Sequence, residues 1–229
     1  MRAIAIDGPA GAGKSTVARR VAERLGAKYI DTGAFYRALA LKAREAGVSA
    51  DDEEALARLW AESEIALEGA GGAVRIRLDG RDVTEAIRRP EIGAAASRVA
   101  RHPAVRAAVV ARLRHLAERE AVVMDGRDIG TVVLPEARIK IFLTASPEAR
   151  ARRRHAELAA AGYAVRFEDV LAELVARDRQ DMTRETAPLR KAPDAIEIDT
   201  TDKSIEEVVG AIVALAEAQH QAFLSVEGR

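Results

Sequence analysis

A glycine-rich segment near the start of the chain, GPAGAGKST at residues 8–16, has the residue types and the spacing of a phosphate-binding loop. In such a loop the glycines let backbone N–H groups curl around a triphosphate, and a lysine reaches its outer phosphates. The hydroxyl residue after the lysine can bind Mg²⁺. The predicted triphosphate-binding residues are Gly8, Pro9, Ala10, Gly11, Ala12, Gly13, Lys14, Ser15 and Thr16.

A second magnesium-binding group is expected at Asp125, which directly follows the apolar run AVVM. Ligands of open parallel sheets gather at the carboxyl ends of the strands, so this carboxylate could hold the ion directly or through water. A turn-forming role before Gly126 is the alternative, and the two roles are compatible. The segment DGRD occurs twice, but its first copy at 79–82 follows an alternating strand, where Asp-Gly predicts a hairpin turn. Only the second copy, with Arg127 and Asp128, is favoured for chemistry.

The acceptor of the phosphoryl group is suggested by arginines. The chain has no Asn, so it lacks the guanine-recognition motif of a G-protein. A sugar or alcohol would need a general base, whereas a phosphate monoester needs charge neutralisation and alignment. Thr32 could cap the helix after the second predicted strand, with Arg37 about one turn inside that helix. A simple cap and a surface arginine is the alternative for this pair.

The charged segment at 175–190 has an unusual pattern when it is placed on a helix that starts at Phe167. At about 100° per residue, Asp181 falls inside the apolar arc, and Arg177 and Arg184 lie along its edge. Charges that face inward are costly unless they are paired or meet a ligand, which favours a phosphate clamp over a solvated face. The apolar arc comprises Phe167, Val170, Leu171, Leu174, Val175 and Met182. Four further charges are expected to be ordinary solvated groups, namely Asp178, Arg179, Glu185 and Arg190.

A third group of arginines opens the helix predicted from Pro147. Arg150 and Arg154 are expected to share a face, with Arg153 adjacent. In a kinase such a segment could close over the triphosphate as a lid and supply charge in the transition state. An exposed, solubilising basic helix is the alternative.

The elements that must position these residues follow from the apolar pattern. Short apolar strands alternate with helical segments, which predicts a parallel sheet with helices on both faces. The strands are expected at 2–6, 27–31, 121–124, 138–145 and 195–199. Residues 64–83 break this rhythm and predict three short antiparallel strands, joined by glycine turns at 69–72 and 79–80.

Composition excludes several classes of protein. Cysteine is absent, and no two of the four histidines are spaced as a zinc pair, which leaves metal chemistry with oxygen ligands. Lys plus Arg equals Asp plus Glu at 36 each, so no global field favours nucleic acid. No apolar run could span a membrane, and the start of the chain lacks a secretory signal. We therefore expect a cytoplasmic monomer that binds neither nucleic acid nor membrane.

Five motifs in order closely resemble the bacterial cytidylate kinase family: GPAGAGKST, DTGAFYRA, RDVTEAIR, DGRDIGTVV and RDRQDMTRETAPL. The resemblance implies a nucleoside monophosphate kinase that transfers the γ-phosphoryl group of ATP to CMP or dCMP, giving CDP or dCDP, with Mg²⁺. It implies an α/β P-loop kinase fold with a five-stranded parallel sheet flanked by helices. A P-loop kinase core at 1–61 and 104–229, with a lid at about 147–165, would carry a small antiparallel three-stranded CMP-binding insertion at 62–103.

The resemblance also implies roles for individual residues. Ser97 and Arg106 match positions that face the cytosine, with Asp128 completing its recognition, and Asp181 matches the ribose-binding acid. By its residue type alone, Ser97 would be interpreted as a small residue that packs between helices, so its role rests on the resemblance. The implied CMP-binding residues are Thr32, Arg37, Ser97, Arg106, Arg127, Asp128, Arg177, Asp181 and Arg184. The expected catalytic groups are Lys14, Arg127, Arg177 and Arg184, with the lid arginines Arg150, Arg153 and Arg154.

Two alternatives remain open from the sequence. The chain could be another small P-loop kinase that acts on a different monophosphate or on a coenzyme precursor. It could also be a nucleotide-binding regulator without turnover, although a binding module needs fewer of these charged residues.

Overall fold

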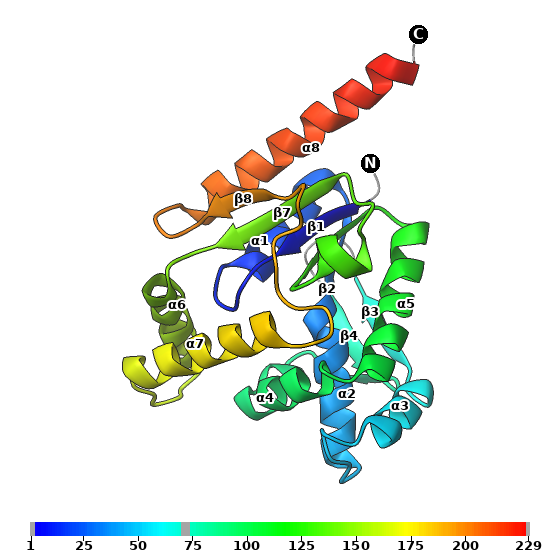
Figure 1. The fold of residues 1–229 in the computed structure, drawn as a ribbon, viewed down its shortest axis with the longest axis vertical. Helices are drawn as coiled ribbons and strands as arrows, with labels where there is room; N and C mark the ends of the chain where they lie inside the picture. The colour runs from blue at the N-terminus through cyan, green and yellow to red at the C-terminus, as the bar shows by residue number, and fades with distance from the viewer. Residues whose placement is uncertain (1–2, 70–73, 228–229) are drawn as a thin grey trace.

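The computed structural model describes residues 3–69 and 74–227, and the side chains as far as Gln219. Its centre is a five-stranded sheet in the order β2-β6-β1-β7-β8, and every pair of neighbouring strands is parallel (Figure 1). The strands are β1 (Ala3–Asp7), β2 (Lys28–Asp31), β6 (Val122–Gly126), β7 (Ile139–Thr144) and β8 (Ile196–Asp199). The five predicted parallel strands are confirmed, with ends that differ by at most two residues.

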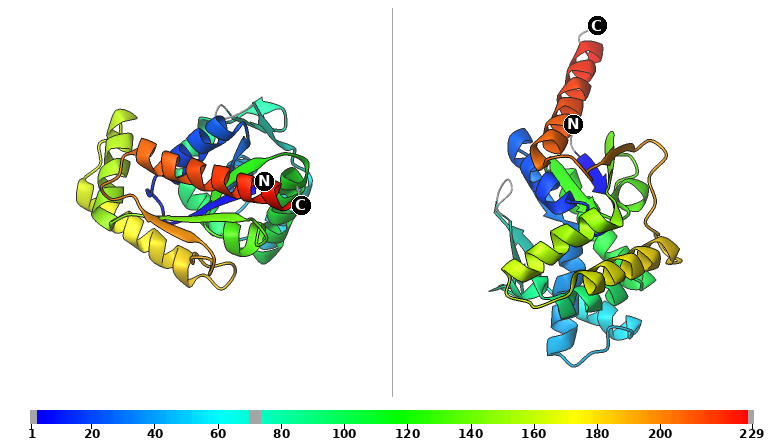
Figure 2. Two further views of the ribbon diagram at one scale, coloured as in Figure 1. Left: turned by 90° about the horizontal axis from the view of Figure 1, so that it is seen from above. Right: turned by 90° about the vertical axis from the view of Figure 1, so that its left-hand side faces the viewer.

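Helices cover both faces of this sheet. Alternate residues of a strand point to opposite faces, and both sets are buried here. Ile4 and Ile6 pack with α1 (Lys14–Leu25) and α8 (Ile205–Glu227), whereas Ala5 faces a second core shared with α2 (Thr32–Glu45) and α5 (Pro103–Arg119). The last turns of α8 project beyond the rest of the protein (Figures 1 and 2).

The segment between α2 and α5 contains the predicted antiparallel sheet. Its strands are β3 (Ile65–Glu68), β4 (Arg75–Leu78) and β5 (Arg81–Asp82), and it is flanked by α3 (Glu53–Ala61), the 3₁₀ turn η1 (Ala86–Arg88) and α4 (Pro90–Val99). Asp79 and Gly80 both have positive φ, at 50° and 79°, as a tight Asp-Gly hairpin requires. The other predicted glycine turn, at 69–72, lies mostly outside the described residues. The division between core and insertion at 62–103 remains a prediction.

A helical hairpin completes the fold at the carboxyl ends of the strands. It consists of α6 (Pro147–Ala160) and α7 (Phe167–Thr183), which lie beyond the tips of the strand arrows in Figure 1. Its apolar side chains form a third, smaller core with Ala10 of the phosphate loop. In the described part of the chain, no helix is both long and apolar enough to span a membrane.

Candidate active site

The phosphate loop lies between β1 and α1, as predicted, and its backbone passes very close to β7. A Cβ atom on Gly8 would lie 2.0 Å from the backbone oxygen of Leu143, and the φ angle of Gly8 is 146°. Both facts require glycine at this position. The loop ends at Gly13, the N-cap of α1, so the positive end of that helix faces the space that the loop encloses.

Lys14 is buried at the centre of this loop. Its Nζ donates to the backbone oxygen of Pro9 at 2.7 Å. Burial, reinforced by the charge of Arg127, lowers the pKa of Lys14 to about 7, although Asp125 acts in the opposite direction. A phosphate beside this amine would favour its charged form, so the loop has the electrostatics of an anion site.

Asp125 follows the last apolar residue of β6, and its carboxylate is held from two sides. Ser15 Oγ donates to Oδ2 and the Tyr29 hydroxyl donates to Oδ1, each at 2.9 Å. Burial, reinforced by the charge of Asp31, raises the pKa of Asp125 to about 6. Ser15 and Asp125 present adjacent oxygen atoms, which is the donor type that Mg²⁺ prefers, so these residues fit the expected metal.

The helix after β2 begins differently from the prediction. Asp31, not Thr32, is its N-cap: the Asp31 carboxylate accepts from Ala34 N at 3.1 Å. The backbone of Asp31 is extended, as an N-cap requires, whereas Thr32 is already helical. The Thr32 hydroxyl instead donates to the backbone oxygen of Asp125 at 2.7 Å. The cap prediction for Thr32 was therefore wrong, although its hydroxyl does lie at the carboxyl end of β6.

Arg37 points back from α2 to the same edge of the sheet. Its guanidinium pairs with Asp31, with a distance of 2.5 Å between Nη2 and Oδ2. The Nε of Arg37 is buried and finds no hydrogen-bond partner among the residues that the structure describes. Such a donor is available to an incoming anion.

The predicted clamp forms around Asp181 of α7. Arg127 Nε donates to Asp181 Oδ2 at 2.8 Å. Burial raises the pKa of Asp181, but Arg127 and then Arg177 and Arg184 outweigh this effect and hold the pKa below its usual range. Burial and the charge of Arg127 lower the pKa of Arg177 to about 10. Within residues 3–69 and 74–227, the Arg177 Nε has no hydrogen-bond partner, which leaves a second buried donor for a phosphate.

Arg184 does not continue α7, contrary to the predicted helix. The helix ends at Thr183, and Arg184 has the extended ψ of 141°. From this position its Nε donates to the backbone oxygen of Ala187 at 2.6 Å, and its Nη2 lies 3.4 Å from Asp128 Oδ1. Arg184 therefore connects the clamp with Asp128.

The apolar arc on α7 was only partly correct. Val175 and Met182 were predicted to face inward, but they are 49% and 52% exposed. The buried stripe is instead Val170, Leu174, Asp178 and Asp181, at spacings of four and three residues, as expected for one helix face. Asp178, predicted to be solvated, is thus a correction as well: it is 8% exposed.

A buried ion pair lies where the cytosine is expected. Arg106 of α5 pairs with Asp128 Oδ2, and the two residues are 4% and 6% exposed. Arg106 Nη1 also donates to the backbone oxygen of Ala100 at 3.1 Å. The Ser97 hydroxyl donates to the backbone oxygen of Gly93 in its own helix, at 3.2 Å. The roles of these residues in base recognition remain predictions.

The lid arginines have three different environments. Arg150 is buried and pairs with Asp178. Arg153 Nη2 donates to the backbone oxygen of Thr200 at 2.5 Å. The Arg154 side chain is 38% exposed and pairs with Glu157 on the same helix. Arg150 and Arg154 lie four residues apart on α6 and therefore share one face of it, as predicted. Their environments differ because the first turn of α6 packs against the phosphate loop, whereas the Arg154 side chain is partly exposed.

Tyr29 belongs to this site and was missed by sequence reasoning. Its hydroxyl contacts Asp125 across the β2–β6 pair. The available signal was a tyrosine in a buried strand, since a buried phenol needs a hydrogen-bond partner.

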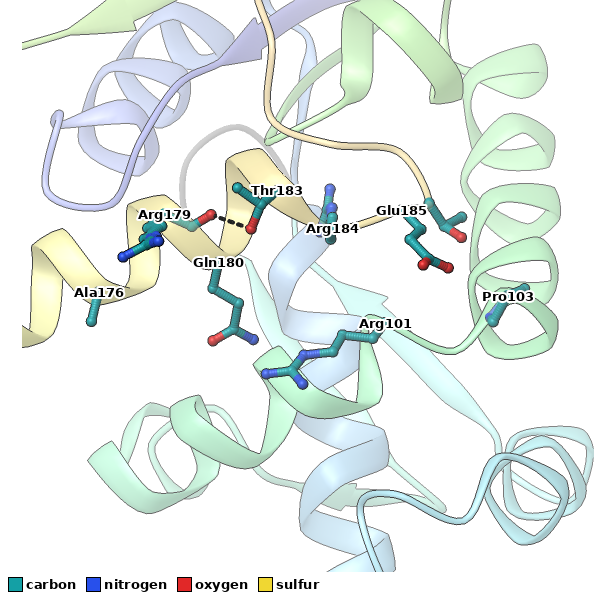
Figure 3. Close-up of a pocket in the computed structure, with 9 residues that line it drawn as sticks. Arg101, Pro103, Ala176, Arg179, Gln180, Thr183, Arg184 and Glu185 are labelled. Atoms are coloured by element: carbon teal, nitrogen blue, oxygen red, sulfur yellow. Dashed lines mark hydrogen bonds between the residues drawn. The ribbon is translucent and has the colours of Figure 1, made fainter.

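A cavity of about 610 Å³ opens beside the clamp, between α7 and the turn that joins α4 to α5. Figure 3 shows the Gln180 amide pointing toward the Arg101 side chain. The lining residues are Arg101, Pro103, Ala176, Arg179, Gln180, Thr183, Arg184, Glu185 and Thr186. Arg184 is shared by the cavity and the clamp.

The chain is similar to known proteins over most of its length. The sequence model described as cytidylate kinase matches residues 4–218. The cytidylate kinase of Pelotomaculum thermopropionicum is 56% identical over 216 residues, which cover 94% of this chain and 96% of that protein. The cytidylate kinase of Carboxydothermus hydrogenoformans is 50% identical over 212 residues, covering 93% and 96%. A solved structure of an uncharacterized protein from Eubacterium ventriosum shares the fold, with a TM-score of 0.51 at 14% identity, over 95% of this chain and 98% of that one.

Proposed function

The chain belongs to the cytidylate kinase family, and we propose that it transfers the γ-phosphoryl group of ATP to CMP or dCMP at the site described above. ATP and CMP are thus its nucleotide substrates. One observation carries the assignment of the site: the carboxyl end of β6 contacts both the phosphate loop and the acceptor residues. The Asp125 carboxylate accepts from Ser15 of the loop and its backbone oxygen accepts from Thr32. Arg127 follows two residues later and donates to Asp181.

On the donor side, the residues bind and align the triphosphate. The loop amides and the start of α1 would surround the phosphates, and Lys14 would exchange its contact with Pro9 for a phosphate oxygen. Ser15 and Asp125 would hold Mg²⁺, which supplies charge neutralisation on the phosphates when it is bound.

On the acceptor side, the phosphate of CMP is itself the nucleophile. A phosphate monoester is anionic at neutral pH, so no general base is needed, and its alignment and charge neutralisation decide the rate. We assign this task to Arg37, Arg127, Arg177 and Arg184. The buried and unpartnered Nε atoms of Arg37 and Arg177, noted above for the described residues, support this assignment. Thr32, at the end of the same sheet, would contribute a hydroxyl.

Base and sugar recognition are assigned to the neighbouring polar groups. Cytosine differs from uracil at its exocyclic amine and at a ring nitrogen. A pocket with the Asp128 carboxylate and the donors Arg106 and Ser97 can discriminate, because the wrong base leaves a buried group unpaired. Asp181 is assigned to the ribose hydroxyls.

The lid arginines are assigned different roles. Arg154 is partly exposed, and its partner Glu157 lies on the same helix, so it can approach the phosphates without breaking a contact to the core. Arg153 is bound to the backbone of Thr200 and would anchor the lid at the edge of the sheet. Closure of the hairpin would exclude water from the transferring phosphoryl group.

A coupled assay of ADP release with CMP, dCMP, UMP, AMP and GMP tests the proposed function. CMP and dCMP should give the highest kcat/KM. A preference for AMP or GMP would indicate another monophosphate kinase, and binding of ATP without turnover of any acceptor would indicate a regulator. We further propose that the chain acts as a monomer in the cytoplasm. Size-exclusion chromatography with light-scattering detection tests the oligomeric state.

A further inference from the structure

One buried guanidinium connects the phosphate loop, the central sheet and the helix that carries the acceptor clamp. Arg150 Nη1 donates to Asp178 Oδ2 of α7 at 2.6 Å and to the backbone oxygen of Ala10 in the phosphate loop at 3.1 Å. Its Nε donates to the backbone oxygen of Ala145, just after β7, at 3.0 Å. Arg150 is 4% exposed and Asp178 is 8% exposed. The Arg150–Asp178 pair, called the joint below, therefore links the phosphate loop, the end of β7 and α7 through buried contacts.

Packing reinforces this joint. A Cβ atom on Gly11 would lie 2.9 Å from the Arg150 Cβ, so the loop backbone lies directly against the first turn of α6. Ala10 packs into a small apolar core with the two helices of the hairpin, separate from the two larger cores of the protein. The members of this core are Ala10, Ala151, Leu158, Val170 and Leu174. The tip of the loop thus packs directly against the hairpin.

The acceptor clamp begins at the same place on α7. Asp178 directly follows Arg177, and Asp181 lies one turn further along, where it binds Arg127. A shift of the phosphate loop that is transmitted through Arg150 to Asp178 therefore displaces Arg177 and Asp181 as well.

The Arg150–Asp178 pair leaves one carboxylate oxygen without a hydrogen bond, so its geometry can change. Asp178 Oδ1 is buried without a hydrogen-bond partner in the described part of the chain. An unsatisfied buried oxygen is costly. Rotation of the Arg150 guanidinium could satisfy it by forming a bidentate pair with the carboxylate.

We propose that Arg150 and Asp178 are positioning residues that couple occupation of the phosphate loop to the geometry of the acceptor arginines, so that ATP and CMP strengthen each other's binding. This inference rests on the proposed function. It assigns Arg150 to supporting the phosphate loop from the side of α6, whereas the sequence predicted direct contact with the triphosphate. It also assigns a function to Asp178, the partner of Arg150.

The test is the binding of CMP with and without a non-hydrolysable ATP analogue, adenylyl imidodiphosphate with MgCl₂, by isothermal titration calorimetry. In the unaltered chain the analogue should lower the Kd of CMP by about fivefold or more, within the usual range of coupling between two sites. Asp178→Asn and Arg150→Lys should bring this ratio close to one and should lower kcat at saturating substrate. Lysine keeps the charge but lacks the planar fork that reaches the loop and α7 together.

Asp169→Asn is the matched control, because it makes the same chemical change at an exposed position of the same helix. It should leave the ratio unchanged. The inference is overturned if both variants keep the ratio of the unaltered chain, or if that chain turns over CMP but shows no coupling. If Asp178→Asn does not fold, Arg150→Lys alone decides. Absence of CMP turnover by the unaltered chain would instead refute the proposed function, so the two failures are distinguishable.

Discussion

Removal of the Asp128 carboxylate should destabilise the protein, because it leaves a buried arginine without its partner. Asp128 pairs with Arg106 through Oδ2 and approaches Arg184 through Oδ1. Breaking a buried pair from one side costs about 3–5 kcal/mol. Arg106 would keep its bond to Ala100 and its position 5.7 Å from the centre of the Tyr36 ring, so the lower end of this range, roughly 3 kcal/mol, applies to Asp128→Ala.

Thermal unfolding followed by circular dichroism measures this loss. For a chain of this length each kcal/mol shifts Tm by about 2–4 °C, so Asp128→Ala should melt roughly 6–12 °C below the unaltered protein. The double variant Asp128→Ala/Arg106→Met removes both charges and should recover most of the loss, since replacing a whole buried pair by apolar groups is close to neutral. A loss under about 1 kcal/mol in the single variant, or no recovery in the double variant, would refute the reasoning.

The same substitution should weaken the discrimination between bases. Without the Asp128 acceptor, the ratio of kcat/KM for CMP to that for UMP should fall by roughly tenfold or more. Asp82→Ala is the matched control, because Asp82 occupies the equivalent position in the first DGRD segment, where it is exposed and accepts from Thr84 N. An unchanged ratio in Asp128→Ala would exclude a role in base recognition.

Three further predictions concern the phosphate loop. Lys14→Ala should abolish phosphoryl transfer while CMP binding, measured by calorimetry, largely survives; near-normal turnover would contradict the assignment of the donor site. Because the pKa of Lys14 is about 7, a rise in pH through 7 removes its charge, and kcat/KM for ATP should fall over that range. Lys14→Arg stays charged, so its kcat/KM for ATP should not fall over this pH range, even if the rate is low. If the fall persists in the arginine variant, it is caused by the titration of another group. Gly8→Ala should lower kcat by about a hundredfold or more, because the new Cβ displaces the loop from Leu143. Gly210→Ala, on an open face of α8, should keep normal activity, and similar rates for the two glycine variants would contradict the clash.

The sequence was sufficient for those features that depend on local pattern. Five apolar runs predicted the parallel strands, and the spacing of glycines, lysine and serine predicted the phosphate loop. Both predictions succeeded because the patterns that indicate a buried strand or a phosphate loop involve only residues close together in the chain. The position of Asp125 was predictable as well, since it follows a buried strand and the carboxyl ends of parallel strands share one edge.

Contacts between distant segments were not predictable. Asp178 lies on the helix face that the apolar residues defined, but its partner Arg150 is 28 residues away on another helix. A helical projection shows which residues share a face and does not show what packs against it. The predicted apolar arc therefore wrongly included Val175 and Met182, which are exposed to solvent. Tyr29 was missed for the same reason, because its partner Asp125 lies 96 residues along the chain.

The structure shows how partly buried arginines of the acceptor site are kept stable. Three of the proposed acceptor arginines already face a carboxylate: Arg37 faces Asp31, Arg127 faces Asp181, and Arg184 approaches Asp128. A largely buried cation without a partner would be destabilising, so these carboxylates supply the opposite charge that stabilises it. Each guanidinium has five N–H donors, and a carboxylate that occupies one or two of them leaves the others for a phosphate. The carboxylates therefore stabilise the ligand-free site and at the same time weaken its attraction for phosphate. The incoming monophosphate must add contacts to groups that are already paired, and this favours a ligand that also binds through its base and its ribose over free inorganic phosphate.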